Sequence, residues 1–474
     1  MLEKLLSLIE VTFPIPGRFR EKLCYDIADL SRLLTAARGE REGGYLNRPN
    51  MLSAYLRYFL PWNLFRLCHL FSLDAGSFAR TENPAKANSP AITGNQSILP
   101  VLSDGDAITD LGSGPLTLPI ALWIAFPELR NIQLEFRCVD KSAATLDAGY
   151  KLFRALCAAT QSGEHNNNIS NSAAGWKIKT IHDSIDAPIR GKPAKLVTAV
   201  NVFNEIYPEM QRGSILKSAE KTATLLCKLC ADDGSILVVE PGNPQGGAFI
   251  SALRTALLNK GRYPAAPCTH TGICPLPGIS SSPPTAQTRD VKDQANSKNG
   301  HAHSTKAKWC HFAFDTETAP AALHALSIEA RIPKERATFS FLLAEPQRKP
   351  ETKRMHTNTA TPDIKRMYVT STALDIKRMH VTSTALDIKR MRVTAATHQI
   401  PLPIRIVSDT FPVPFQKGGL GCYGCSERGM ILVCGNRTQF NAVQHGSLLT
   451  LTLPNKEQRD PKTGALIIPL IDFL

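Results

Sequence analysis

Residues 107–126 read AITDLGSGPLTLPIALWIAF, and this stretch decides the class of fold. A strand pattern, the acidic Asp110, a turn with Gly112 and Gly114, and an apolar helix pattern follow one another without a gap. Glycine permits a tight turn and the close approach of another molecule to the backbone, and the start of a helix presents amide groups to an electronegative group. The stretch therefore predicts a nucleotide-binding turn between a strand and a helix.

Alternating strand and helix patterns extend this unit over residues 105–265. Its β-rich runs are separated by amphipathic segments, which is typical of a doubly wound, largely parallel sheet. The fold class is therefore predicted as α/β. The β-rich runs are AITDL, LEFRCVD, WKIKTIH, KLVTAVNVF and SILVVEP.

The regions around this unit differ from it in composition. Residues 1–80 carry apolar residues at helical spacing, which predicts an N-terminal helical domain, and residues 81–104 are expected to be a linker. Residues 266–345 are irregular and rich in Cys, Pro and His, and their insert at about 279–307 is predicted to be disordered because it has almost no large apolar side chain. β-like runs occur in ATFSFLLA at the end of this region, and in PIRIVS and GMILVC of residues 401–474.

A repeat of twelve residues fills much of residues 346–400, as in DIKRMYVTSTAL and DIKRMHVTSTAL. Repeats that stack into a solenoid usually have about twenty residues or more, and these units offer few side chains to bury, so a disordered loop is predicted. The stretch from Glu345 to Ile400 has eleven Lys or Arg against five acidic residues and so carries +6 of the net charge of +14. It is either a sequence expansion without a specific function or a basic arm with a weak, salt-sensitive attraction to phosphate.

Length and composition limit the class of protein. With 474 residues the chain is long enough for two to four domains and a sizeable core, which excludes a disulfide-stapled miniprotein. Its positive net charge favours a polyanionic partner, of which nucleic acid is the first candidate. The twelve cysteines, without a secretory signal, suit a reducing compartment in which thiols pack, react or bind metal. No disulfide-linked partner is expected.

The start of the chain carries Glu3 and Glu10 and lacks a cleavable apolar segment. These acids and the lack of a Ser/Arg bias argue against a mitochondrial transit peptide. The longest uncharged run, Leu111–Pro127, is shorter than the ~20 residues of a membrane span and contains Gly and Pro. We therefore expect a cytoplasmic protein without a membrane partner.

Three polar side chains stand where parallel strands are expected to end. Asp140 closes the run LEFRCVD, at the position from which such folds offer a carboxylate to ribose hydroxyls. Asn204 and Glu205 follow the fourth run, at the carboxyl edge where open α/β sheets bind ligands. Each of them could instead cap a helix or end a strand. The dinucleotide fingerprint G-x-G-x-x-G fails, because Thr117 stands at its third glycine.

Cysteines gather in the irregular part of the chain. Cys268 and Cys274 lie in a Pro/Gly-rich loop, Cys310 follows in KWCHF, and further cysteines lie in GCYGCSERGMILVC. Four thiolates are the natural ligand set of an iron-sulfur cluster or a structural zinc, whereas free surface thiols are the alternative. His270 and His311 are substitute ligands or hydrogen-bond partners of such a site. The fourth thiolate would come from Cys422, Cys425 or Cys434.

The remaining six cysteines have simpler explanations. They lie in helical or strand patterns and are predicted to pack as apolar thiols, including the C-x-x-C pair of LLCKLC. The C-x-x-x-C-x-x-C signature of radical enzymes is absent from the sequence. The six are Cys24, Cys68, Cys138, Cys157, Cys227 and Cys230.

The acidic residue directly before the glycines resembles motif I of S-adenosylmethionine-dependent methyltransferases. This resemblance implies that S-adenosylmethionine is bound by residues of the first three strands and of the turn. It places Asp183, which follows the third run, near the adenine. The implied cofactor-binding residues are Asp110, Gly112, Gly114, Asp140 and Asp183.

Six blocks in the order DLGSGPLTLP, VNVFNEI, VVEPG, APCTHTGICPL, WCHF and YGCSERGMIL resemble the methyltransferase-like family of mitochondrial and bacterial small-ribosomal-subunit assembly proteins. The resemblance covers roughly residues 20–345 and 401–474. It implies a Rossmann-like class I methyltransferase sheet, an N-terminal helical domain and a Cys-rich, metal-binding C-terminal β region. It also implies a [4Fe-4S] cluster and binding to small-subunit ribosomal RNA or the immature subunit, during assembly or translation. The implied cluster ligands are Cys268, Cys274, Cys310 and Cys425.

One residue departs from the family pattern. Leu116 stands where the family commonly has a glycine after Gly-Pro. A leucine at this position either crowds the cofactor or points into the core.

Three functions follow from these observations. The first is an iron-sulfur RNA-binding protein of ribosome assembly that uses the methyltransferase fold mainly as a scaffold. The second is an active ribosomal RNA methyltransferase in which Asn204 or Glu205 lines the acceptor site; methyl transfer needs alignment at near-attack distance and no visible base. The third is a zinc-stabilised small-molecule methyltransferase, against which the basic charge counts.

Overall fold

The computed structural model describes residues 1–37, 40, 44–72, 98–161, 175–207, 212–278, 308–347, 401–414, 418–441 and 443–470. Most of the expected linker, the insert at 279–307 and repeat residues 348–400 lie outside the described residues. Met1–Gln347 and Ile400–Leu474 together form one compact unit.

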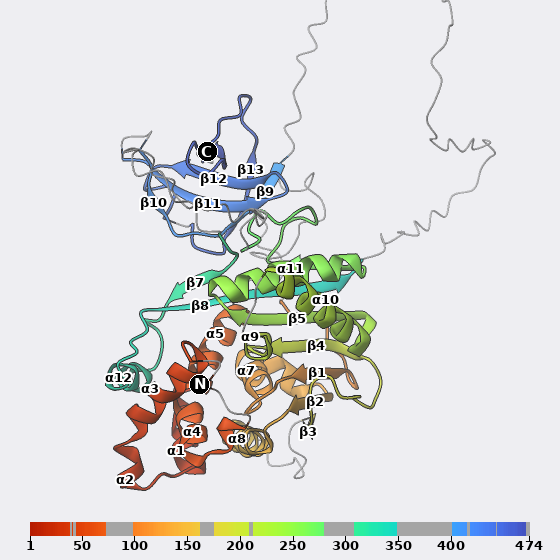
Figure 1. Cartoon of the computed structure of the whole chain (residues 1–474), viewed down its shortest axis with the longest axis vertical. Helices are drawn as coiled ribbons and strands as arrows, with labels where there is room; N and C mark the ends of the chain where they lie inside the picture. Colours follow the sequence, from red (N-terminus) through yellow and green to blue (C-terminus); the bar gives the residue numbers. More distant parts are fainter. Residues whose placement is uncertain are drawn as a thin grey trace, which may run out of the picture. The chain divides into compact units, whose positions relative to one another are not determined.

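A central sheet carries the predicted α/β unit (Figure 1). Its strands are β1 (Ala107–Leu111), β2 (Leu134–Asp140), β3 (Trp176–His182), β4 (Ala194–Val200), β5 (Cys230–Pro241), β6 (Arg262–Ala266), β7 (Phe312–Asp315) and β8 (Arg336–Pro346). They lie in the order β3-β2-β1-β4-β5-β8-β6, with β7 paired to β8. Strands β1 to β5 are parallel, and β8 is antiparallel to β5, β6 and β7. This order confirms the Rossmann-like sheet, and all five predicted runs form strands.

The strand order reverses between β1 and β4, which is the place where open α/β sheets bind ligands. The antiparallel β8 contains ATFSFLLA, so the last part of the Cys-rich region belongs to the central sheet. Its neighbours β5 and β6 end 70 or more residues before it begins, and such distant pairing leaves no local pattern.

Helices cover both faces of the central sheet. Ile108 of β1 faces the core that includes α5, α7 and α8, whereas Ala107 and Leu111 face the core that includes α10 and α11. Strands buried on both faces read as continuous apolar runs, which explains why they were predictable. The helices are α5 (Leu60–Ser72), α7 (Thr117–Ala125), α8 (Ala143–Gln161), α10 (Arg212–Leu229) and α11 (Pro244–Asn259), with the short η5 (Pro127–Asn131) and α9 (Phe203–Ile206) between them.

The N-terminal region is helical, as predicted, and it shares its core with the sheet. Leu5 and Ile9 pack in the same core as α7 and α8. Trp62 packs with Leu323 and donates its indole N–H to Ser327 Oγ at 3.3 Å. The elements are α1 (Leu2–Thr12), α2 (Gly17–Arg20), α3 (Leu23–Leu34), η2 (Tyr45–Asn47), α4 (Pro49–Ala54), the π-helix η3 (Tyr55–Phe59), and α12 (Ala321–Glu329) from later in the chain.

The C-terminal region forms a second sheet, which confirms the predicted β structure. Its strands are β9 (Pro401–Ile406), β10 (Phe411–Pro412), β11 (Leu420–Ser426), β12 (Gly429–Gly435), β13 (Leu448–Thr452) and β14 (Leu466–Pro469). They lie in the order β13-β9-β11-β12-β14, with β10 paired to β11. Alternate residues such as Ile404, Ile431 and Val433 fill its core.

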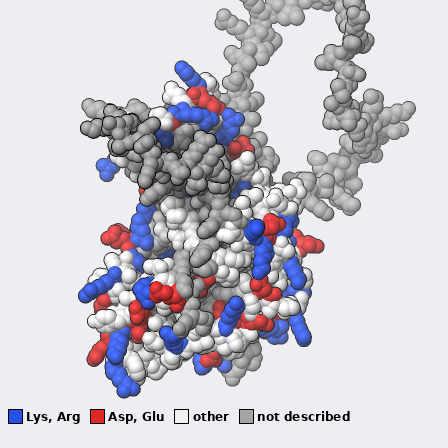
Figure 2. All heavy atoms as spheres, in the orientation of Figure 1, with Lys and Arg blue, Asp and Glu red and all other residues white. Residues whose placement is uncertain are grey.

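The surface in view carries charges of both signs. Figure 2 shows Lys and Arg interspersed with Asp and Glu among the described residues. Ion pairs such as Lys179 Nζ to Glu135 Oε2 at 2.8 Å join some of them. No described helix has the length and apolar character that a membrane-spanning helix requires.

Candidate functional site

The turn after β1 has the backbone that its glycines predict. Gly112 and Gly114 have φ of +63° and +52°, in the left-handed region that glycine adopts readily. A Cβ on Gly112 would lie 2.5 Å from a methyl group of Val202. A Cβ on Gly114 would meet no heavy atom within 4 Å. Gly112 therefore allows close packing against β4's end, and Gly114 borders open space in which a ligand has room.

Asp110 lies beneath this turn and is fully buried. Its Oδ2 accepts a hydrogen bond from Ser113 Oγ at 2.6 Å, and its Oδ1 accepts one from Thr198 Oγ1 at 2.7 Å. Burial raises the pKa of Asp110 to about 6. Both oxygens are engaged within the protein, so Asp110 ties the turn to β4.

Asp140, at the end of β2, forms hydrogen bonds with the turn after β1. Its Oδ2 accepts from the Gly114 N–H at 2.9 Å and its Oδ1 from the Ser142 N–H at 2.8 Å. Burial raises the pKa of this carboxyl group. Each carboxylate oxygen has a second lone pair, so Asp140 keeps acceptor capacity for a hydroxyl. The exposed Asp183 lies next to it, because its N–H donates to the Asp140 carbonyl at 3.1 Å.

Leu116 points into the core. It is fully buried among the residues that α7 and α8 contribute. Its φ of +56° places it in the left-handed region, at the residue before α7 begins. Glycine suits this backbone best, which is a physical reason for a glycine at this position. Leucine is accommodated here because its side chain is buried in the core.

A buried carboxylate that the sequence analysis missed organises the end of β4. Glu240 of β5 accepts hydrogen bonds from the N–H groups of Val202, Phe203 and Asn204, at 3.2, 2.8 and 3.1 Å. It thereby caps the N-terminus of α9. An acidic residue at the end of the apolar run SILVVEP is the signal that points to it.

Asn204 and Glu205 have different surroundings. The Asn204 amide, in the orientation that satisfies its neighbours, donates to the Asn201 carbonyl at 2.9 Å and to Glu240 at 3.0 Å. Asn204 is thus buried and held inward. Glu205 is half-buried, and its Oε2 accepts from the Tyr45 hydroxyl at 3.4 Å.

The N-terminal turn η2 contacts this edge of the sheet at two points. Besides the contact of Tyr45 with Glu205, Asn47 Oδ1 accepts from Ser142 Oγ at 2.9 Å. Ser142 follows β2 and Glu205 follows β4, so η2 bridges the strand ends on both sides of β1. The Gly-rich turn, Asp140 and Glu205 therefore lie at one edge, beneath a helical turn from the N-terminal region.

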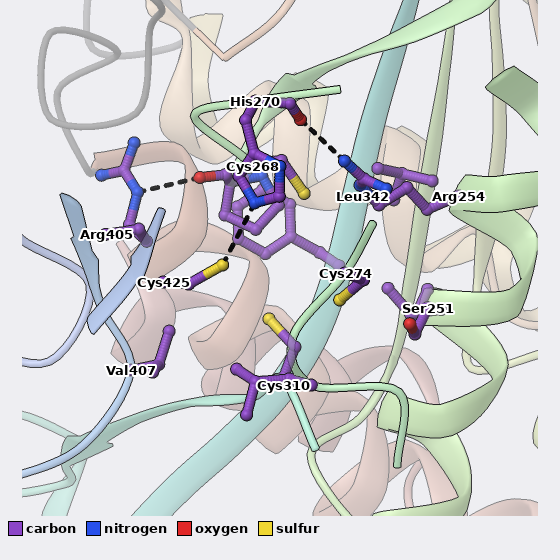
Figure 3. A pocket seen from close by; sticks show the side chains of 14 residues that line it. Ser251, Arg254, Cys268, His270, Cys274, Cys310, Leu342, Arg405, Val407 and Cys425 are labelled. Atoms are coloured by element: carbon purple, nitrogen blue, oxygen red, sulfur yellow. Dashed lines mark hydrogen bonds between the residues drawn. The ribbon is translucent and has the colours of Figure 1, made fainter. Parts of the chain in front are cut away.

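Four cysteines from distant segments line a second site (Figure 3). Cys268 and Cys274 lie in the loop after β6, Cys310 lies two residues before β7, and Cys425 lies on β11. Figure 3 shows their sulfur atoms directed toward a shared space. The sequence left three candidates for the fourth cysteine of this group. Cys425 lines the pocket, whereas Cys422 and Cys434 pack in hydrophobic cores of the C-terminal sheet.

Buried cations accompany these thiols. Arg254 Nη2 donates to the His270 carbonyl at 2.7 Å, and Arg405 Nε donates to the Pro267 carbonyl at 2.9 Å. His270 Nε2 lies 3.5 Å from Cys425 Sγ, whereas His311 does not line the pocket. Sequence analysis missed both arginines; the signal for Arg405 is a charged residue within the apolar strand of PIRIVS.

Burial affects the acidity of three of the pocket thiols. Burial raises the pKa of Cys268, and it raises the pKa values of Cys310 and Cys425 well above that of an ordinary thiol. Neighbouring thiols add to the effect on Cys310 and Cys425, and the positive charge of Arg405 opposes it.

The predicted metal-binding property of the C-terminal region is not supported by the geometry. Among the residues that the structure describes, no group of three or more His, Cys, Asp or Glu side chains is arranged to hold a metal ion. A single zinc ion needs its sulfur ligands at about 2.3 Å from one point. The thiols share a pocket without meeting that condition.

The remaining cysteines lie in apolar surroundings. Cys138, Cys157 and Cys230 are buried, and the other three are half-buried; these are Cys24, Cys68 and Cys227. Burial raises the pKa of Cys230 to about 11. A thiol of such high pKa is a poor nucleophile, in agreement with a packing role.

Comparison with protein families gives one match, over part of the chain. Residues 106–282, less than half of the chain, match the family described as mitochondrial small ribosomal subunit Rsm22. Among curated proteins no match reaches significance.

Solved structures resemble the chain only distantly. YjhP from E. coli has 16% identity and a TM-score of 0.21, with 31% of this chain and 46% of that chain covered. A putative methyltransferase from Thermoplasma acidophilum has 10% identity and a TM-score of 0.26, with 52% and 70% covered. An S-adenosylmethionine-dependent methyltransferase from Thiobacillus denitrificans, in complex with S-adenosylhomocysteine, has 12% identity and a TM-score of 0.27, with 52% and 87% covered. The chain thus spans less than half the length of YjhP.

Proposed function

We propose that this chain is a methyltransferase-fold protein of the small ribosomal subunit, which binds small-subunit RNA and carries an iron-sulfur cluster. The family match carries the proposal, because residues 106–282 contain the Gly-rich turn, Asp140 and the first two pocket cysteines. The excess of Lys and Arg supports a nucleic-acid partner.

S-adenosylmethionine is the cofactor proposed for the turn. The open space beside Gly114 and the carboxylate of Asp140 support this assignment. The bound cofactor would supply a transferable methyl group. Asp140 would accept from its ribose hydroxyls, and the exposed Asp183 would face the adenine side, while Asp110 holds the turn.

The cluster proposed for the second site is [4Fe-4S], bound by Cys268, Cys274, Cys310 and Cys425. Four thiols facing one pocket form the ligand set of such a cluster. Each thiolate would bind a different iron, so the sulfurs need not surround a single ion as they must for zinc. The bound cluster would supply a covalent link between the loops of the central sheet and β11.

RNA binding is tested with the full chain and a fragment of small-subunit ribosomal RNA at 50 to 200 mM salt. We expect log Kd to vary linearly with log salt, with a slope of about 0.7 to 0.9 per phosphate contacted. A large-subunit fragment of equal length is the control. Equal affinity for both RNAs would contradict a small-subunit function.

The metal content is tested on protein purified without oxygen. We expect about four irons and four sulfides per chain, since that is the composition of the cluster. Cys268→Ser should lose both. Stoichiometric zinc without sulfide in the wild-type chain would instead favour the zinc-stabilised methyltransferase.

An active ribosomal RNA methyltransferase is the second candidate, and the position of Glu205 favours it. This carboxylate is half-buried at the same edge as Asp140, so it can reach an acceptor. Transfer of a radiolabelled methyl group to small-subunit RNA, lost in Glu205→Ala while cofactor affinity is kept, would support it. No transfer by cofactor-loaded protein would leave the scaffold function.

We propose a mitochondrial location for this chain. The matching family is described as mitochondrial, which favours a mitochondrial location over the expected cytoplasmic one. Cell fractionation with antibodies to the natural protein tests this.

A further inference from the structure

Two half-buried cationic side chains lie near each other, Arg66 on α5 and Lys334 in the loop between α12 and β8. The Lys334 ammonium lies 5.9 Å from the centre of the Tyr58 ring, and the Tyr58 hydroxyl donates to the Ile332 carbonyl at 3.1 Å. The Lys334 carbonyl accepts from Thr316 Oγ1 at 2.5 Å. These contacts hold the loop that carries Lys334 against the π-helix η3.

Neither cation has an acidic partner among the residues that the structure describes. Arg66 Nη1 donates to Asn63 Oδ1 at 2.9 Å, whereas its Nε is buried without a hydrogen-bond partner. Burial and the nearby positive charge of Arg66 lower the pKa of Lys334 to about 8. Burial also lowers the pKa of Arg66. An anion bound beside both would relieve this repulsion and favour the charged forms.

The two cations lie at the edge of the central sheet that carries the Gly-rich turn. Strand β8 is antiparallel to β5, and Phe339 near its start pairs with Pro241 at the end of β5. Lys334 precedes β8, so it lies at the edge where the parallel strands end. Arg66 lies on α5, which Figure 1 shows beside β8.

The strand order separates these cations from the ribose and adenine side of the proposed cofactor. Asp140 and Asp183, which we assign to the ribose and the adenine, follow β2 and β3, on one side of β1. Strand β8 is three strands from β1 on the other side, beyond β4 and Glu205. Three strand spacings correspond to about 14 Å. The cations therefore lie on the side of Glu205, at which we place the acceptor.

Polar contacts join the cations to the acceptor side. Asn63, the partner of Arg66, donates from Nδ2 to the Tyr55 hydroxyl at 3.5 Å. Burial and the negative charges of Glu205 and Asp140 raise the pKa of Tyr55, and the charge of Arg66 opposes this effect. Tyr55 therefore lies between the cations and the carboxylates of the cofactor edge in electrostatic terms.

We propose that Arg66 and Lys334 together bind one phosphate of the RNA backbone, on the acceptor side of the cofactor edge. This inference rests on the proposed binding of small-subunit RNA. A guanidinium presents its donors in a planar arrangement that matches phosphate oxygens, and an ammonium adds a compact point charge. Phosphate contacts position a nucleic acid without reading its sequence. The pair would thus fix the place of the strand relative to the cofactor.

The test compares Arg66→Met, Lys334→Met and the double variant with the wild-type full chain. The measurements are the Kd for the small-subunit RNA fragment over a range of salt concentrations and the Kd for S-adenosylmethionine from isothermal titration. We expect each single variant to raise the RNA Kd about tenfold, because a charged hydrogen-bond contact is lost. In the double variant the slope of log Kd against log salt should decrease by about 0.7 to 0.9, which is the loss of one phosphate contact. The cofactor Kd should stay unchanged.

Lys195→Met is the matched control. Lys195 also has a largely buried side chain, 23% exposed, but it lies at the start of β4, at the opposite edge of the sheet. Its Nζ donates to Asp233 Oδ2 at 2.8 Å, so its charge is compensated within the protein. This variant loses the same charge as the others and should keep the wild-type RNA Kd.

Charge-keeping variants provide the second control. Arg66→Lys and Lys334→Arg should bind the RNA more tightly than the corresponding Met variants. If a Met variant fails to fold, as judged by circular dichroism, the neutral and polar Gln variant replaces it.

The outcomes separate the two proposals. A wild-type chain that binds the small-subunit and large-subunit fragments equally overturns the proposed function. A wild-type chain that prefers the small-subunit fragment, with Met variants of unchanged RNA affinity, overturns the role of Arg66 and Lys334 alone. An RNA Kd raised equally in Lys195→Met likewise overturns it, because a general loss of positive charge would then explain the effect. Weaker cofactor binding with unchanged RNA binding would assign the two cations to the cofactor and also overturn the inference.

Discussion

The N–H of Gly114 donates to Oδ2 of Asp140 at 2.9 Å, so the turn after β1 is bonded to the end of β2. The same carboxylate accepts from the N–H of Ser142, which in turn bonds to Asn47 of the N-terminal region. Asp140 therefore positions the turn and contributes to the edge of the sheet at which we place the cofactor.

Replacing Asp140 should weaken the proposed cofactor binding. Asp140→Ala removes the acceptor for ribose hydroxyls and the bond to Gly114, and hydrogen bonds to a charged group contribute about 1.5 to 3 kcal/mol each. We expect the Kd for S-adenosylmethionine, from isothermal titration, to rise at least about tenfold. Asp147→Ala, at an exposed position of α8 where the carboxylate pairs with Lys151, is the control. Equal affinity of the two variants would contradict the role of Asp140.

Much of the central sheet could be predicted because its strands are buried on both faces and read as apolar runs. The position of β8 within the sheet could not be predicted from the sequence. Its run ATFSFLLA predicts a strand, but its pairing with β5 and β6 depends on antiparallel contacts between segments far apart in the chain. No local pattern carries that information.

The same distinction holds within the sites. Asp140 and the two glycines follow a strand directly, so their position could be predicted from local order. Glu240 bonds to Phe203 of α9, and Arg405 bonds to Pro267 in the loop after β6. These partners are distant in the sequence, so the roles of Glu240 and Arg405 appear only once the folded arrangement is known. The choice of Cys425 came from family resemblance, and the spacing of the cysteines alone left three alternatives open.

The burial of Asp110 should make stability depend on pH. Its pKa rises from 3.8 to about 6 on folding, so the folded chain holds the proton more strongly than the unfolded chain. The resulting stabilisation is complete below about pH 3.8 and is lost as the pH rises through about 6. Asp110→Asn cannot titrate. The free energy of unfolding of the wild type, relative to this variant, should fall by on the order of 3 kcal/mol between pH 4 and 7.

Urea unfolding at four pH values between 4 and 7 measures this difference. Other titrating groups are common to both proteins, so their effects cancel in the comparison. Parallel stability curves for the wild type and Asp110→Asn would show that Asp110 does not have a raised pKa.

At position 116 a glycine variant should be more stable than an alanine variant, which is the reverse of the usual order inside a helix. Both Leu116→Ala and Leu116→Gly lose the packing of a buried leucine, at a cost of about 2 to 5 kcal/mol. At φ of +56° alanine is strained by about 1 to 2 kcal/mol and glycine is not. We expect Leu116→Gly to be the more stable by about 1 kcal/mol in urea unfolding. At Leu118, which is equally buried but inside α7, the alanine variant should be the more stable. The same order at both positions would contradict the prediction.

The fourth thiolate of the proposed cluster can be identified by three single substitutions. Cys425 lines the pocket and lies 3.5 Å from His270, whereas Cys422 and Cys434 pack in separate hydrophobic cores. Alanine keeps an apolar side chain at these positions, so Cys422→Ala and Cys434→Ala should keep about four irons and four sulfides per chain. Cys425→Ala should lose most of both while the chain stays folded. Iron and sulfide analysis of the three variants measures this, and retention of the full content in Cys425→Ala would assign the fourth ligand to another residue.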